Sequence, residues 1–157
     1  MDKVPMTREG LKALEDELKR LKTEERPAVI QAIAAAREHG DLSENAEYDA
    51  AREKQGFIEG RVAELEAVIS LAEVIDTTGM TGDTVRFGAT VVLADDDTGE
   101  EVTYRIVGQH EANLEHGKIS VTSPLARALI GKSVDDAVEV TTPGGSKSYE
   151  ICEVSYK

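Results

Sequence analysis

Residues 48–72 read YDAAREKQGFIEGRVAELEAVISLA, and one periodic pattern runs through the whole stretch. Positions spaced alternately three and four residues apart carry Tyr48, Ala51, Gln55, Ile58, Val62, Leu65, Ile69 and Ala72. Only Gln55 in this series is strongly polar, which is the heptad pattern of a helix that packs along another helix. Gly56 and Gly60 each destabilise such a helix by about 1 kcal/mol relative to alanine. We therefore expect its stability to come from a partner helix.

The partner helix lies upstream. Thr7 is placed to be its N-cap, and the same spacing recurs at Leu11, Leu14, Leu18 and Leu21. The apolar series slips by one position across Pro27 and then resumes at Val29, Ile33 and Ala36. Because proline lacks a backbone donor and crowds the preceding turn, we expect a kink or a brief break there. Two helices of about 30 residues joined by a short turn predict an antiparallel hairpin ~45 Å long.

The pattern changes near residue 78. Four of the 13 glycines precede this point and nine follow it. Apolar residues then alternate with period two from Val85 to Leu93, and again in two later segments that are bounded by the turn sequences DDDTGE and TPGG. Such alternation between turn signals is typical of antiparallel strands.

One short helix interrupts these strands, because Ser123 and Pro124 are placed as an N-cap and a first helical residue. We therefore predict an α+β chain of two domains. Residues 1–78 form a coiled-coil helical hairpin with an acidic tip at about 40–47. Residues 79–157 form a small antiparallel-sheet domain with one short helix.

The chain is acidic, with 31 Asp and Glu residues against 18 Lys and Arg residues and a net charge of −13. Residues 1–78 hold 11 basic and 18 acidic residues, and residues 79–157 hold 7 and 13, so neither half is basic. Non-specific binding to nucleic acid depends on cations that neutralise phosphates. We expect no binding to free nucleic acid, and a partner must hold any nucleic acid on which the chain acts.

The compartment follows from what the sequence lacks. A single cysteine, Cys152, cannot form an internal disulfide, which favours a reducing environment. No apolar signal segment or run of membrane-spanning length occurs. His39, His110 and His116 lack zinc-site spacing. We expect a cytoplasmic, monomeric protein without a membrane anchor or a cofactor of its own.

The sequence AREHGDLSENAEYD at residues 36–49 concentrates five acids around a Gly-Asp turn. One interpretation is helix capping, because Asp41 and Glu44 have the spacing of a capping box. The helix dipole also stabilises an acidic side chain in the first turn by about 0.3–1 kcal/mol. The other is magnesium binding, since this ion prefers oxygen ligands and takes one or two carboxylates. Two carboxylates cannot complete such a site, so a partner that binds phosphates must supply the remaining ligands.

Several long motifs together resemble one family. AREHGDLSENAEYDAAREKQGF is followed in order by LAEVID, FGATV, TYRIVG, SPLARALIGK and TPGG. This series, which covers essentially the whole chain, is similar to the GreA/GreB family of bacterial transcript cleavage factors. The resemblance implies an FKBP-like fold for the C-terminal domain. It also implies a factor whose helical hairpin enters the secondary channel of RNA polymerase and whose globular domain docks on the rim.

The resemblance further implies roles for particular residues. Asp41 and Glu44 match the acids that help the polymerase bind its second magnesium ion and orient water, so that the polymerase cuts the backtracked RNA 3′ end itself. Arg37 and Arg52 fit the basic residues behind the tip that face RNA. The small number of cations there points to the GreA type rather than the more basic GreB type.

Other residues receive structural interpretations. Glu47 and Asp49 are expected to be solvated, and Tyr48 is expected to pack in the hairpin seam. Ser123 and Pro124 are fully explained by a helix start, to which the resemblance adds docking on the polymerase.

Two other functions remain open. A non-cleaving relative could occupy the same channel and inhibit the polymerase, but such relatives differ chiefly at the tip, and the intact GDLSENAEY argues against this function. The second open function is that of an FKBP-like chaperone or prolyl isomerase. The C-terminal half has two prolines, four Phe or Tyr residues and no Trp. So few aromatic residues argue against an aromatic-lined pocket that binds proline.

Overall fold

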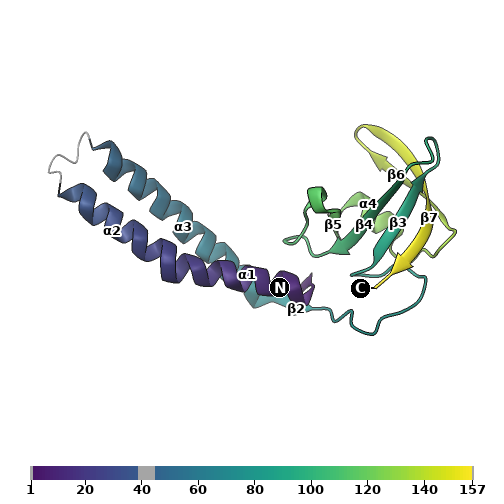
Figure 1. Ribbon diagram of the computed structural model, residues 1–157, viewed down its shortest axis with the longest axis horizontal. Helices are drawn as coiled ribbons and strands as arrows, with labels where there is room; N and C mark the ends of the chain where they lie inside the picture. The colour runs from purple at the N-terminus through teal and green to yellow at the C-terminus, as the bar shows by residue number, and fades with distance from the viewer. Residues whose placement is uncertain (1, 39–44, 157) are drawn as a thin grey trace. The chain divides into compact units, whose positions relative to one another are not determined.

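The computed structural model describes residues 2–38 and 45–156 (Figure 1). The chain divides into two compact units. The first is built on residues 11–72, and the second on residues 3–10 together with residues 73–157. The N-terminal segment 3–10 thus belongs to the same unit as the C-terminal half. The domain boundary at residue 78 stays a prediction.

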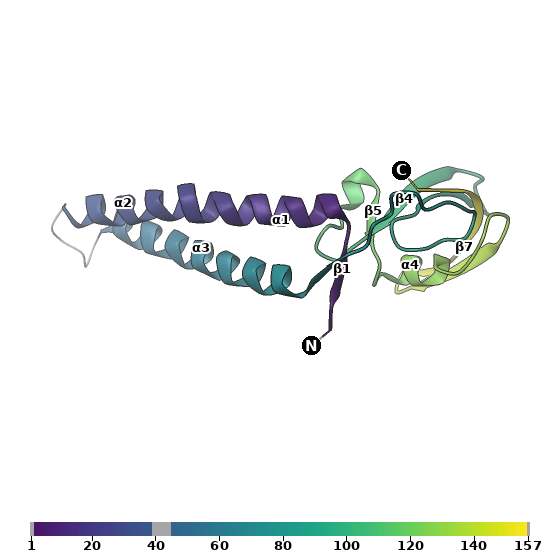
Figure 2. The same ribbon diagram turned by 90° about the horizontal axis from the view of Figure 1, so that it is seen from below.

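The first unit is the expected helical hairpin. Helix α1 (Arg8–Arg20) continues through a π-helical turn (Leu21–Glu25) into α2 (Arg26–Arg37), and α3 (Ala46–Leu71) lies beside them (Figures 1 and 2). The apolar side chains buried in these helices are Leu14, Leu21, Val29, Ile33, Ala36, Ala51, Ile58, Val62 and Leu65. Each occupies a position of the two heptad series, so the seam predicted from spacing is the core of the hairpin.

The π-helical turn explains the slip in the first series. The backbone N–H of Arg26 donates to the carbonyl of Leu21, five residues back, where an α-helix would reach back four. A π turn accommodates one additional residue, which is the one-position slip seen in the sequence. Pro27 has no N–H to donate and would crowd the carbonyl of Thr23 in a regular α-helix. The break expected at Pro27 therefore takes the form of a widened turn just before it.

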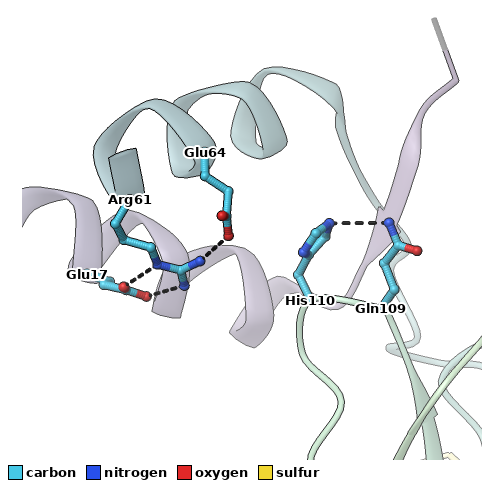
Figure 3. A network of polar contacts seen from close by, with 5 residues as sticks. All are labelled: Glu17, Arg61, Glu64, Gln109 and His110. Atoms are coloured by element: carbon cyan, nitrogen blue, oxygen red, sulfur yellow. Dashed lines mark hydrogen bonds and ion pairs between the residues drawn. The ribbon is translucent and has the colours of Figure 1, made fainter. Parts of the chain in front are cut away.

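Ion pairs link the two sides of the hairpin. Arg61 donates from Nε and Nη2 to the two carboxylate oxygens of Glu17 at 2.7 and 2.8 Å, and its Nη1 contacts Glu64 (Figure 3). Arg26 makes a similar two-point contact with Glu59 at 2.8 and 2.7 Å. Hydrogen bonds from Arg61 hold the pKa of Glu17 below its ordinary value. Arg26 follows Glu17 in the first arm of the hairpin, whereas its partner Glu59 precedes Arg61 in the second arm. The two pairs therefore fix an antiparallel register.

The second unit contains a five-stranded sheet with the strand order β5-β4-β3-β7-β6. Its strands are β3 (Thr90–Asp95), β4 (Glu101–Val107), β5 (Lys118–Ser120), β6 (Ala137–Thr142) and β7 (Gly145–Ser155). Adjacent strands are antiparallel except for β5, which pairs parallel to β4. Helix α4 (Pro124–Leu129) contributes Ala126 and Leu129 to the core, where both are fully buried.

The first strand of this sheet begins later than the alternation predicts. Val85 and Ala89 are fully buried, as period two requires, yet β3 begins only at Thr90. Gly88 between them has φ of 87°, in the left-handed region that interrupts an extended chain. Phe87 is only half-buried and Gly88 and Ala89 are buried in succession, so the strict alternation of burial begins with the strand itself.

The N-terminal segment is anchored within the second unit by the predicted Thr7 cap and by long-range contacts that the sequence did not predict. Strand β1 (Val4–Met6) pairs with β2 (Ala72–Val74), and Met6 is fully buried. The carboxylate of Glu111 accepts hydrogen bonds from the backbone N–H groups of Thr7 at 2.9 Å and Gly108 at 2.8 Å, and from the Thr7 hydroxyl. The Thr7 hydroxyl in turn accepts from the N–H of Gly10 at 3.0 Å, as an N-cap does. Glu111 thereby ties Thr7 to the loop after β4, within the second unit.

Within the described ranges, no helix is both long enough and apolar enough to cross a membrane.

Candidate functional site at the hairpin tip

The two predicted site acids lie between the ends of two described helices. Helix α2 ends at Arg37 and α3 begins at Ala46. Asp41 and Glu44 fall within residues 39–44, which lie outside the described residues. Their roles as catalytic and metal-binding groups therefore stay predictions, and the geometry that bears on them is that of the flanking residues.

The cap of α3 is Asn45. Its side-chain Oδ1 accepts from the backbone N–H of Tyr48 at 3.0 Å, and its backbone carbonyl accepts from the N–H of Asp49 at 3.1 Å. Asparagine is among the best N-cap residues, so this helix start is satisfied in the ordinary way. A capping box on Asp41 and Glu44 would place the cap four residues earlier. In the described residues, the cap of α3 is Asn45.

Sequence reasoning did not identify Asn45, although an Asn directly before AEYDAAREK is a recognisable N-cap signal. Glu47 and Asp49 fill the first turn of α3 and are exposed, where the helix dipole favours acids.

The two arginines predicted to face RNA line the same groove. This groove, of about 250 Å³, is bounded by Ile30, Ile33, Ala34, Arg37, Arg52 and Gln55. Arg37 comes from the last turn of α2 and Arg52 from α3, so the antiparallel packing brings them to one surface. Two guanidinium groups above aliphatic side chains can pair with phosphate oxygens and stack on a planar base.

Tyr48 supports one of these arginines. The guanidinium carbon of Arg37 lies 5.9 Å from the centroid of the Tyr48 ring, within cation–π range. Tyr48 is half-buried, as its heptad position predicts. Its ring therefore packs in the hairpin and supports Arg37.

In the part of the chain that the structure describes, no three His, Cys, Asp or Glu side chains are grouped so that they could hold a metal ion. Cys152 is exposed on β7, and desolvation together with Glu101 and Glu150 raises the pKa of its thiol. A raised pKa reduces the thiolate fraction on which cysteine nucleophiles depend.

Ser123 and Pro124 begin helix α4, as predicted. The Ser123 hydroxyl accepts from the N–H of Ala126 at 3.2 Å, and Pro124 is the first helical residue. The next residue, Leu125, lines a cleft of about 360 Å³ together with Val140 and Tyr149. The Ser123 cap and the position of Pro124 account for both residues as a helix start, and their docking role stays a prediction.

Comparison with known proteins places both units. Residues 4–74 match the family described as transcription elongation factor, N-terminal, and residues 80–156 match transcription elongation factor, GreA/GreB, C-term. The chain is 64% identical to a transcription elongation factor GreA of Phenylobacterium zucineum over 156 residues, covering 99% of both chains. It is 63% identical to the protein of that name from Rhodospirillum rubrum, again over 99% of each. A solved structure of the transcription factor Gfh1 aligns at 28% identity, with 98% and 99% coverage and a TM-score of 0.47.

These matches define the class of protein as a transcription elongation factor with a helical hairpin and a separate sheet unit. The chain belongs to the GreA/GreB family.

Proposed function

We propose that this chain binds bacterial RNA polymerase and stimulates the polymerase's own cleavage of the backtracked transcript 3′ end. Family membership over the full chain supports the elongation role. In this proposal the hairpin enters the secondary channel and the sheet unit docks at its rim. The chain is then a cofactor of the polymerase, acts as a monomer in the cytoplasm, and has no separate catalytic centre.

The observation that carries the proposal is the cap of α3. Asn45 accepts from the Tyr48 N–H, so this N–H does not require a carboxylate from Asp41 or Glu44. Those two groups supply the oxygen donors that magnesium prefers, in the number that one protein usually gives it. When bound, the ion stabilises charge on the phosphodiester and lowers the pKa of an attacking water.

The groove with Arg37 and Arg52 gives the second part of the proposal. The chain has net charge −13, so attraction to RNA must be local, and this groove places two permanent cations on one surface. We assign Arg37 and Arg52 to contacts with the extruded RNA 3′ end while the polymerase holds it. Free RNA, without the polymerase, should not bind.

The test is a stalled transcription complex with 3′ end-labelled RNA, to which the purified chain is added with magnesium. Release of short 3′ fragments supports the proposal. Binding to polymerase without fragment release would favour the non-cleaving channel regulator. Prolyl isomerisation of a model peptide, with no effect on the complex, would favour the FKBP-like alternative.

A further inference from the structure

Asn45 makes a second contact that capping does not require. Its side-chain Nδ2 donates to the carbonyl of Ala36 in the last turn of α2 at 2.7 Å, nine residues earlier in the chain. The same side chain therefore caps α3 through Oδ1 and holds α2 through Nδ2. The reverse orientation of the amide would place its NH₂ group against the Tyr48 N–H, so both contacts fix one orientation.

The two helix ends joined in this way are themselves firmly placed. Ala36 is 2% exposed and Ala51, in the second turn of α3, is 8% exposed. The contact of Arg37 with the Tyr48 ring forms a second link between the same two turns. The Asn45 amide therefore lies between packed elements, where a hydrogen bond restricts geometry more than it would on a free surface.

We propose that Asn45 is a positioning residue for transcript cleavage, and that its Nδ2–Ala36 hydrogen bond is the part that matters. This inference rests on the proposed function of Asp41 and Glu44. Both acids lie in the chain segment between the two groups that the bond joins, so the bond fixes the separation of that segment's ends. Displacement of a reacting group by about 1 Å can reduce a rate by about 100-fold, which makes such a constraint worth keeping.

The alternative is that Asn45 serves only as a cap, and substitutions can separate the two roles. Serine and aspartate cap helices about as well as asparagine. Neither can reproduce the amide: an ionised aspartate has no donor, and serine ends at the single Oγ that caps α3, one bond short of the amide nitrogen that reaches the Ala36 carbonyl. If Asn45 is only a cap, Asn45→Ser and Asn45→Asp should behave as the parent does.

The experiment measures fragment release by the full-length chain in the stalled complex, over a range of factor and magnesium concentrations. For Asn45→Ser we expect the maximal rate to fall at least ~10-fold. The factor concentration that gives half the maximal rate should stay within about two-fold of the parent, because no surface that docks on the polymerase has changed. Raised magnesium should not restore the rate, since both carboxylates are present but misplaced. Asp41→Asn is the matched comparison, and there raised magnesium should restore part of the lost rate.

Several results would overturn the inference. A parental maximal rate for Asn45→Ser or Asn45→Asp, with Asp41→Asn impaired, leaves the proposed function standing and removes the positioning role. Full restoration of Asn45→Ser by magnesium would mean that the residue acts on metal affinity rather than position. A parental rate for Asp41→Asn itself would refute the proposed function and this inference with it. Circular dichroism of both Asn45 variants checks that α3 is retained, and Asn45→Asp provides the second test if the serine variant does not fold.

Discussion

Replacing Gly10 with alanine should destabilise this protein, although alanine is the better helix former. An added Cβ at Gly10 would lie 2.1 Å from Oε1 of Glu111. The Cδ and Cγ atoms of Glu111 would lie almost as close, so the side chain as a whole must rotate away. That movement breaks the hydrogen bonds that the carboxylate accepts from Thr7 and Gly108. A hydrogen bond to a charged group contributes about 1.5–3 kcal/mol, while alanine gains about 1 kcal/mol in helix propensity.

With more than one such bond broken, the expected net loss is at least ~1 kcal/mol, which lowers the melting temperature by about 2–4 °C. Thermal unfolding of Gly10→Ala measures it. Gly60→Ala is the matched control, because no atom lies within 4 Å of its added Cβ, and it should stabilise the hairpin by about 1 kcal/mol. In a Glu111→Ala background, Gly10→Ala should also become stabilising. If Gly10→Ala alone raises the melting temperature, the carboxylate does not hold the N-terminal segment as described.

Three further expectations follow from the hairpin and its charge. Deleting Thr23 and replacing Pro27 with alanine removes the additional residue of the π turn together with its cause, so thermal unfolding should show unchanged stability. Deleting Gln31 instead should lower the stability by several kcal/mol, because Ile33 and Ala36 then leave the seam. Arg61→Gln should cost up to ~1 kcal/mol at neutral pH in urea unfolding. Because the pKa of Glu17 is lowered in the folded state, this difference is present above its ordinary value of 4.5 and should shrink as the pH falls below it; a difference independent of pH contradicts the assignment. Fluorescence anisotropy with labelled RNA at physiological salt should detect no binding, and tight, salt-sensitive binding would refute the charge argument.

The sequence predicted the hairpin well because a heptad pattern is local and repeated. Each buried position from Leu14 to Leu65 is marked by its own spacing, so an error at one residue does not shift the rest. The slip across Pro27 was visible as well, although whether it becomes a kink or a π turn depends on hydrogen bonds that spacing does not specify. Thr7 and Ser123 were predicted as caps for a similar reason, because capping involves neighbours three residues away.

Contacts between distant residues could not be predicted in this way. Thr7 and Glu111 are 104 residues apart, and no local pattern marks Glu111 as a partner of the first helix. The three-residue strand β1 is too short to show alternation. Asn45 had a readable cap signal, but its bond to Ala36 depends on how α2 and α3 pack. The spacing of Asp41 and Glu44 is local and visible in the sequence, whereas the chemistry proposed for them depends on a partner.

The most direct test of the central claim replaces Asp41 with Asn and, separately, Glu44 with Gln, and measures transcript cleavage in the stalled complex. Asn and Gln keep the capping ability and the shape of the original side chains, so stability should stay within about 1 kcal/mol and competition for polymerase should be unchanged. Neither amide brings charge to a magnesium ion beside phosphates. We expect cleavage to fall at least ~10-fold for each variant, with partial recovery at raised magnesium. Cleavage at the parental rate by either variant, with normal binding to polymerase, would contradict the claim that these carboxylates are the active element.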